Sequence, residues 1–174
     1  GQLTLRAAKQ VVLGNDTAGQ SLTLDGAGIT IEASGFDSAG AGSVQLTSGV
    51  ALSGHTLAVQ AGNTAARSQI GGSNADGSLA DANADFWLDE VHLGRVISQS
   101  TGFDAVQIGR IDQSGVTDFR GADLSSAASS AITVQGGSGG LLLSGVTTLA
   151  AGKTLTLSDT SGSMATNGSF SAIN

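Results

Sequence analysis

The stretch Leu22–Ile31, LTLDGAGITI, contains the pattern that decides the expected fold. Two triplets with apolar outer residues, Leu22–Leu24 and Ile29–Ile31, flank Asp25–Gly26. In an extended chain the outer two side chains of such a triplet point to one face and the middle one to the other. Gly and Asp tolerate the backbone conformations of turns. The stretch therefore predicts two short, half-buried strands.

The same apolar-x-apolar triplet recurs in both halves of the chain, with Thr, Gln, Ala or His usual in the middle. Gly, Ser, Asn and Asp fill the intervals, and these residue types favour turns. No stretch shows a helical period with caps, and the Ser content of Ala122–Ala131 favours a turn there. The further triplets are Leu3–Leu5, Val11–Leu13, Val44–Leu46, Val50–Leu52, Leu57–Val59, Val91–Leu93, Val106–Ile108, Ile132–Val134, Leu141–Leu143 and Leu155–Leu157.

The spacing of the triplets indicates a solenoid. Leu3, Leu22 and Val44 recur at intervals of about 20 residues, which is typical of one winding. We therefore expect an all-β, right-handed parallel β-helix (β-solenoid) of roughly eight windings, each contributing two or three short strands. Aromatic residues make up only 3% of the chain, and stacked windings tolerate this because each layer buries its aliphatic side chains against similar layers. An antiparallel β-sandwich is the alternative, since it also has short strands and regular turns.

We expect residues 1–174 to form a single solenoid segment of a longer chain, with an irregular excursion at about 61–85, where the triplets thin out. The strand pattern begins at Gln2 and is still present at Ile173, and neither end shows a cap. Open solenoid ends expose sheet edges. The windings are therefore expected to continue in a longer chain, or to stack end to end on other copies.

Composition excludes several classes of function. The net charge is -7, and the seven basic residues are scattered, so no nucleic-acid footprint is present. No apolar run approaches the ~18 residues of a membrane helix, so no membrane insertion is expected. Cysteine is absent, which excludes disulfides and thiolate metal sites. The residues contain no signal peptide, so any export signal is expected elsewhere.

The triplets with their Gly, Asn and Ser turns resemble the β-helix stalks of filamentous-haemagglutinin-like exoproteins and other giant bacterial surface adhesins. The segment Gly102–Gly115, GFDAVQIGRIDQSG, is similar to a "G-F-x-x-(V/I)-x-I-G-R-x-D-x-S-G" coil of very long repetitive surface proteins. The resemblance implies a secreted or cell-surface protein acting in attachment, aggregation, biofilm or filament formation, and not an enzyme. Its implied partners are neighbouring coils of the same protein or other copies, and host or environmental surface glycans.

An acidic region suggests calcium as a possible ligand. Gly71–Leu79, GGSNADGSL, is close to one nonapeptide of the calcium-binding β-roll but departs from it at Asn74. Hard cations take several oxygen ligands, which clustered carboxylates supply. β-roll sites form between adjacent copies, however, and one copy is present, so a solvated acidic loop is the alternative. A calcium-stiffened binding module would use Asp76, Asp81, Asp85, Asp89 and Glu90.

A carbohydrate-active β-helix enzyme, either a polysaccharide lyase or a hydrolase, is another alternative. Arg110, Asp112, Asp118 and Arg120 share one face if they lie in strands, because alternate residues point the same way. A glycosidase needs two carboxyl groups that flank the sugar. The competing interpretation is ion pairing at the surface, which contributes little stability.

Three further side chains, those of Trp87, His55 and His92, could contact a ligand. Trp87 is the only Trp and is a candidate sugar platform, although a Trp between Phe86 and Leu88 also suits buried packing. His55 and His92 are expected to be exposed, and they lack metal-binding spacing.

Overall fold

A computed structural model describes residues 1–15, 21–34, 42–72, 83–128 and 131–173. Most of these residues lie in β-strands, and one short α-helix is present among them. All strand pairs formed by the described residues are parallel. The all-β prediction is therefore confirmed, and the hairpin pairing that a sandwich requires does not occur in this part of the chain.

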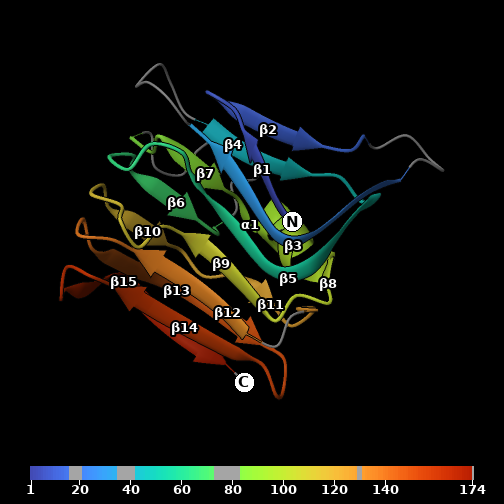
Figure 1. Cartoon of the computed structure of the whole chain (residues 1–174). Coiled ribbons are helices and arrows are strands. Elements are labelled where there is room, and N and C mark those ends of the chain that lie inside the picture. The colour runs from blue at the N-terminus through green and yellow to red at the C-terminus, as the bar shows by residue number, and fades with distance from the viewer. Residues whose placement is uncertain (16–20, 35–41, 73–82, 129–130, 174) are drawn as a thin grey trace.

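The strands form two sheets, and in each sheet the strands lie side by side, with the N-terminal strands at one end and the C-terminal strands at the other (Figure 1). Sheet A has the order β1 (Gln2–Arg6), β3 (Leu22–Ala33), β5 (Val50–Ala61), β9 (Ala105–Gly109), β12 (Ala131–Gly136) and β14 (Thr154–Asp159), with β8 (Ser100–Thr101) also beside β5. Sheet B has the order β11 (Asp123–Leu124), β13 (Leu141–Leu149), β10 (Thr117–Phe119), β6 (Ser68–Ile70), β7 (Phe86–Leu88), β4 (Gly42–Leu46) and β2 (Gln10–Leu13), with β15 (Met164–Ile173) also beside β13.

The chain passes back and forth between the sheets, and this explains the parallel pairing. Strands β1 to β5 alternate between sheet A and sheet B, as do β12 to β15. Neighbouring parallel strands need a crossover connection, and here the opposite sheet supplies it. Along the path β1–β3–β5, each return to sheet A therefore adds a strand beside the previous one.

Two aliphatic columns of the core run across sheet A. The register places Leu3 beside Ile29, Ile29 beside Leu57, and so on through every strand of the path. Burial of each such side chain contributes about 1.5–3 kcal/mol. One column is Leu3, Ile29, Leu57, Val106, Ile132 and Leu155, and the other is Leu5, Ile31, Val59, Ile108, Val134 and Leu157; the interior members are buried, and the Leu residues at both ends are half-buried.

The expected repeat of about 20 residues is wrong. Leu3 pairs with Ile29, whereas Leu22 pairs with Val50. The reason is that the triplets Leu22–Leu24 and Ile29–Ile31 both belong to the long strand β3, so one winding includes both of them. Sheet A consequently has six levels along its path, fewer than the eight windings expected.

The region 61–85 contains a strand that the sequence analysis missed. Strand β6 lies within it, and β7 directly after it inserts between β4 and β6. Sheet A remains continuous, because β5 pairs directly with β9. The excursion thus adds a strand to sheet B alone. Residues 73–82 lie outside the described residues.

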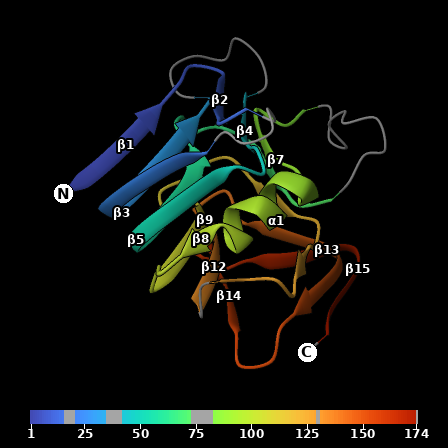
Figure 2. The ribbon, with the colours of Figure 1, turned by 90° about the vertical axis from the view of Figure 1, so that its right-hand side faces the viewer.

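The expectation that no helix is present is wrong. Helix α1 (Glu90–Ser98) follows β7 and lies at the side of the molecule between the two sheets (Figure 2). Its N-cap is Asp89, whose carboxylate accepts a hydrogen bond from the His92 backbone N–H at 2.8 Å. Leu93, Val96 and Ile97 form its buried face. The triplet Val91–Leu93 is therefore the first turn of a helix and not a strand.

The turns that follow the sheet A strands stack so tightly that glycine is required. A Cβ atom on Gly137 would lie 2.0 Å from the Gln113 carbonyl oxygen, and one on Gly139 would lie 2.2 Å from the Gly115 carbonyl oxygen. Gly139 N–H also donates to the Gln113 carbonyl at 3.2 Å. The Gly-rich turn therefore sets the spacing between windings.

We expect Gly137→Ala to lower the free energy of unfolding by about 1–3 kcal/mol, because the new Cβ atom forces the stacked turns apart. Gly94→Ala is the matched control: Gly94 lies inside α1 with nothing within 4 Å of its Cβ position. Removing a glycine from a helix interior stabilises it by up to about 1 kcal/mol. Urea unfolding followed by circular dichroism measures both. Equal stability of Gly137→Ala and the unmodified chain would contradict the tight stacking.

Candidate functional site

A buried carboxylate connects successive strands of sheet A. Glu32 lies in β3, directly beside Arg6 of β1 and Gln60 of β5 in the register. Each of these residues follows an inward-pointing core residue, so its side chain points outward. Glu32 is nevertheless only 4% exposed. A buried carboxylate needs charged or hydrogen-bonding partners.

Three side chains from other strands and turns lie around Glu32, and a fourth contacts one of these three, Arg110. Arg6 forms an ion pair with Glu32, and Gln60 Nε2 donates to Glu32 Oε1 at 2.7 Å. Arg110 Nη1 lies 3.7 Å from the same oxygen. The Arg110 guanidinium also forms a two-point contact with Asp112, with distances of 2.8 and 2.9 Å. We call Arg6, Glu32, Gln60, Arg110 and Asp112 the Glu32 ladder.

The Glu32 ladder keeps its carboxylates ionised. Burial alone raises the pKa of Glu32, but hydrogen bonds from Arg6 and Gln60 and the charges of Arg6 and Arg110 outweigh it, so the pKa lies below its ordinary value. The hydrogen bond with Arg110 lowers the pKa of Asp112, and the same contact raises the pKa of Arg110. An acid catalyst needs a carboxyl group that stays protonated near neutral pH. In the Glu32 ladder the pKa values of the carboxyl groups are lowered instead, so these groups are ionised at neutral pH. Their contacts connect β1, β3, β5 and the turn after β9.

The segment Gly102–Gly115 includes β9 and the turn after it, to which Arg110 belongs. Arg110 Nη1 donates to the backbone carbonyls of Ala61 and Gly62 at 3.0 and 3.3 Å. Gln113 is fully buried, and its amide donates to the Ala66 carbonyl and to the Ser68 hydroxyl. The polar residues of this motif therefore bind the neighbouring winding.

The four residues considered for catalysis form two separate pairs. Arg110 and Asp112 follow β9 of sheet A, whereas Asp118 and Arg120 lie at β10 of sheet B. Arg120 Nε donates to Asp118 Oδ2 at 2.9 Å, and Asp118 is fully buried. Asp118 Oδ1 has no hydrogen-bond partner within the described part of the chain. The predicted shared strand face of Asp112 and Asp118 is not formed, because Asp112 lies in the turn after β9 whereas Asp118 lies in β10 of sheet B.

Trp87 is the middle residue of β7 and is half-buried. The register places it beside Ser43 on one side and Gln69 on the other, and Gln69 beside Asp118. These side chains share the face of sheet B that points away from the core. Phe86 and Leu88 point inward and are fully buried. Trp87 therefore belongs to a polar outer row and not to the core.

The acids proposed for calcium have structural contacts where they are described. Asp85 Oδ2 accepts a hydrogen bond from the Arg67 backbone N–H at 2.9 Å, and Asp89 caps α1. Glu90 lies in the first turn of α1, where a negative charge stabilises the helix dipole. Asp76 and Asp81 lie outside the described residues. Within residues 1–15, 21–34, 42–72, 83–128 and 131–173, no group of three or more His, Asp or Glu side chains is arranged to hold a metal ion.

The two histidines differ in their environments. The His55 side chain is 76% exposed, as expected, and its Nδ1 lies 3.1 Å from Asp104 Oδ2. The His92 side chain is only 18% exposed, which differs from the expectation, because it lies on α1 and not in a strand. Its Nδ1 lies 3.2 Å from the Leu46 carbonyl, to which Arg95 also donates. His92 and Arg95 thus attach the helix to the end of β4.

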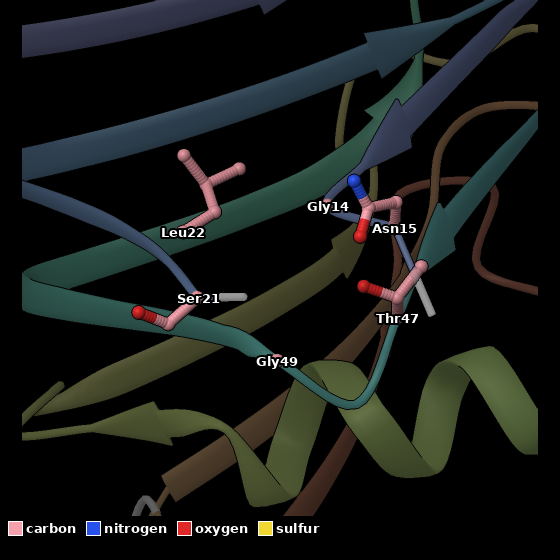
Figure 3. A pocket seen from close by; sticks show the side chains of 6 residues that line it. All are labelled: Gly14, Asn15, Ser21, Leu22, Thr47 and Gly49. Atoms are coloured by element: carbon pink, nitrogen blue, oxygen red, sulfur yellow. The ribbon is translucent and has the colours of Figure 1, made fainter. Parts of the chain in front are cut away.

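A pocket of about 170 Å³ lies between the end of β2, the start of β3 and the turn that joins β4 to β5 (Figure 3). Thr47 contributes a buried hydroxyl that has no hydrogen-bond partner among the described residues. A Cβ atom on Gly14 would lie within 2.3 Å of that hydroxyl, so the glycine leaves the space open. The described residues that line the pocket are uncharged; they are Gly14, Asn15, Ser21, Leu22, Thr47 and Gly49.

Comparisons with protein-family models, with curated proteins and with solved structures found no match to this chain. Among the described residues, no helix has the length and apolar character needed to cross a membrane.

Three members of the ladder were not predicted from the sequence: Arg6, Glu32 and Gln60. Each directly follows an apolar-x-apolar triplet, at Leu5, Ile31 and Val59. A search for charged or amide residues one position after each triplet would have found them.

We expect Glu32→Gln to reduce the free energy of unfolding by roughly 1–3 kcal/mol at neutral pH, because Arg6 and Arg110 lose a charged partner. The folded-state pKa of Glu32 lies below its ordinary value near 4.5. Its stabilising contribution is therefore complete above that value and is lost as the pH falls through the folded-state pKa. The difference between the unmodified chain and Glu32→Gln should shrink in acid.

Urea unfolding between about pH 3 and pH 7 measures this difference. The control is Asp104→Asn, because the Asp104 side chain is 79% exposed and its pair with His55 contributes less than about 1 kcal/mol. A gap between the unmodified chain and Glu32→Gln that stays constant over the whole pH range would contradict the depressed pKa.

Proposed function

We propose that this chain is a segment of a right-handed parallel β-helix that serves as a structural and adhesive stalk in a secreted or cell-surface bacterial protein. The observation that carries the proposal is the continuous register of sheet A, in which each return of the chain places like residues beside like residues. Such a stack grows in one direction and transmits load through every strand. A stalk built from such a stack would be long and stiff.

The right-handed sense is supported by a general rule. Crossovers between parallel strands of one sheet are right-handed in about 98% of cases. Every strand pair in the described residues is parallel, so the rule applies at each level of sheet A.

The arrangement of charges favours a structural function over catalysis. The carboxylates of Glu32, Asp112 and Asp118 each contact an Arg side chain. In the ladder these contacts hold successive strands together, and the pKa shifts keep the acids ionised. A polysaccharide lyase or hydrolase needs an acid or base that is free to exchange protons with a sugar.

Display of the chain on a non-adherent bacterium tests the adhesive part of the proposal. We expect displaying cells to aggregate and to attach to glycan-coated and abiotic surfaces more than cells that display a scrambled chain of the same composition. The extended polar face of the stack provides the contact area. Equal attachment of both strains would contradict adhesion.

A polysaccharide panel tests the enzyme alternative. We expect the purified chain to release neither reducing ends nor unsaturated sugars, because Glu32, Asp112 and Asp118 are engaged by arginines. Release that is abolished in Asp112→Asn, with the folded state preserved, would overturn the structural assignment. The matched variant is Asp104→Asn, which removes an exposed acid outside the Glu32 ladder.

A further inference from the structure

The two sheets differ in length along the same windings. We number the windings by their sheet A strands, from β1 (first) to β14 (sixth). Each winding also supplies one strand of sheet B, namely β2, β4, β6, β10, β13 and β15 in turn. Sheet B additionally contains β7, which lies between β4 and β6. Among the described residues, the path through sheet A has no counterpart of β7, because β3 pairs directly with β5 and β5 with β9.

The extra strand affects a single step of the stack, from the second winding to the third. Sheet A makes this step in one strand spacing, through the pairing of Ile29 with Leu57. Sheet B needs two spacings for the same step, from Ser43 to Trp87 and from Trp87 to Gln69. Neighbouring strands lie about 4.8 Å apart, so sheet B is longer than sheet A by about that amount.

Strand β7 is a packed part of the core. Phe86 and Leu88 point inward from it and are fully buried. Their neighbours on β6, Ser68 and Ile70, are buried as well. Protein interiors are packed closely, so a buried strand at this place keeps β4 and β6 two spacings apart. The stack is therefore wider on the side of sheet B than on the side of sheet A.

We propose that β7 bends the stack, so that the windings before it and after it follow different axes. The axis is the direction along which successive windings lie. Facing sheets lie about 10 Å apart, and a difference of about 4.8 Å across that distance corresponds to a bend of roughly 25–30°. Sheet B lies on the convex side. The inference rests on the proposed stalk, and it means that the stalk changes direction between β3 and β5.

The outer face of sheet A has the contacts that a concave side requires. Glu32 lies on this face at the step opposite β7, and it is only 4% exposed. Arg6 contacts Glu32 from the first winding. Arg110 reaches Glu32 from the turn after the fourth strand of sheet A, with Arg110 Nη1 3.7 Å from Glu32 Oε1. Side chains on a concave face lie closer together than on a flat face, so the Glu32 ladder fits the inner side of the bend.

The bend differs from the ordinary twist of a sheet and can be measured separately. Twist rotates successive strands about the axis of the stack, and it leaves the direction of that axis unchanged. Backbone N–H bonds in parallel strands point toward the neighbouring strands, and their mean direction therefore follows the axis. The mean N–H direction of each winding consequently reports the bend and is insensitive to the twist.

Residual dipolar couplings of the backbone N–H groups measure these directions for the unmodified 17.0 kDa chain in solution. We expect the mean N–H axis of β1 and β3 to differ by roughly 25–30° from that of β9 and β12. The control lies within the molecule: β9 and β12 should share one axis, because their partners β10 and β13 pair directly in sheet B. A single common axis for β1, β3, β9 and β12 would overturn the bend.

The same measurement on Glu32→Gln identifies the cause of the bend. We expect the angle to persist in this variant, because β7 still lies between β4 and β6. Asp104→Asn is the matched control, since it removes an exposed carboxylate outside the Glu32 ladder. Circular dichroism confirms that both variants are folded. An angle that disappears in Glu32→Gln and persists in Asp104→Asn would assign the bend to the ladder and overturn its assignment to β7.

The bend and the stalk function can fail independently. A straight axis in a chain that still promotes attachment of displaying cells would overturn the bend alone. Absence of attachment by cells that display a folded chain with the measured angle would count against the adhesive function and leave the bend in place.

Discussion

The parallel register of sheet A is the constraint on which the rest of the structure depends. It places one aliphatic pair from each winding above the pair from the previous winding, and the interior members are excluded from water. With aromatic residues at 3% of the chain, the buried core is mainly aliphatic, and these columns are part of it. A slip of one residue would turn every column outward, so the hydrophobic effect also fixes the register.

The fixed register determines where polar groups accumulate. Residues one position after each core pair fall into a row, which brings Arg6, Glu32 and Gln60 together although they are distant in sequence. A lone buried carboxylate would be costly, and two arginines and an amide offset that cost. The turns follow the same repeat, and close stacking at Gly137 and Gly139 leaves no room for a Cβ atom.

The region around β6, β7 and α1 departs from simple repetition. Strand β7 enters sheet B between β4 and β6, and α1 then covers the side between the sheets with Leu93, Val96 and Ile97. Asp89 is used as a helix cap, and Asp85 binds the Arg67 backbone. Clustered acids in a sequence therefore have local structural uses that compete with metal binding.

The sequence alone determined the all-β class and most strand positions, because alternation of apolar and polar residues is a local property. It also located the Gly-rich turns. It did not determine the length of a winding: Leu22–Leu24 and Ile29–Ile31 look like separate strands, and only pairing with Val50–Ala61 shows that they are one. The helix was missed because Gly94 weakens its local signal, while tertiary burial of Leu93, Val96 and Ile97 stabilises it. The Glu32 ladder was decided by tertiary structure alone, because its members meet only when separate windings stack in register.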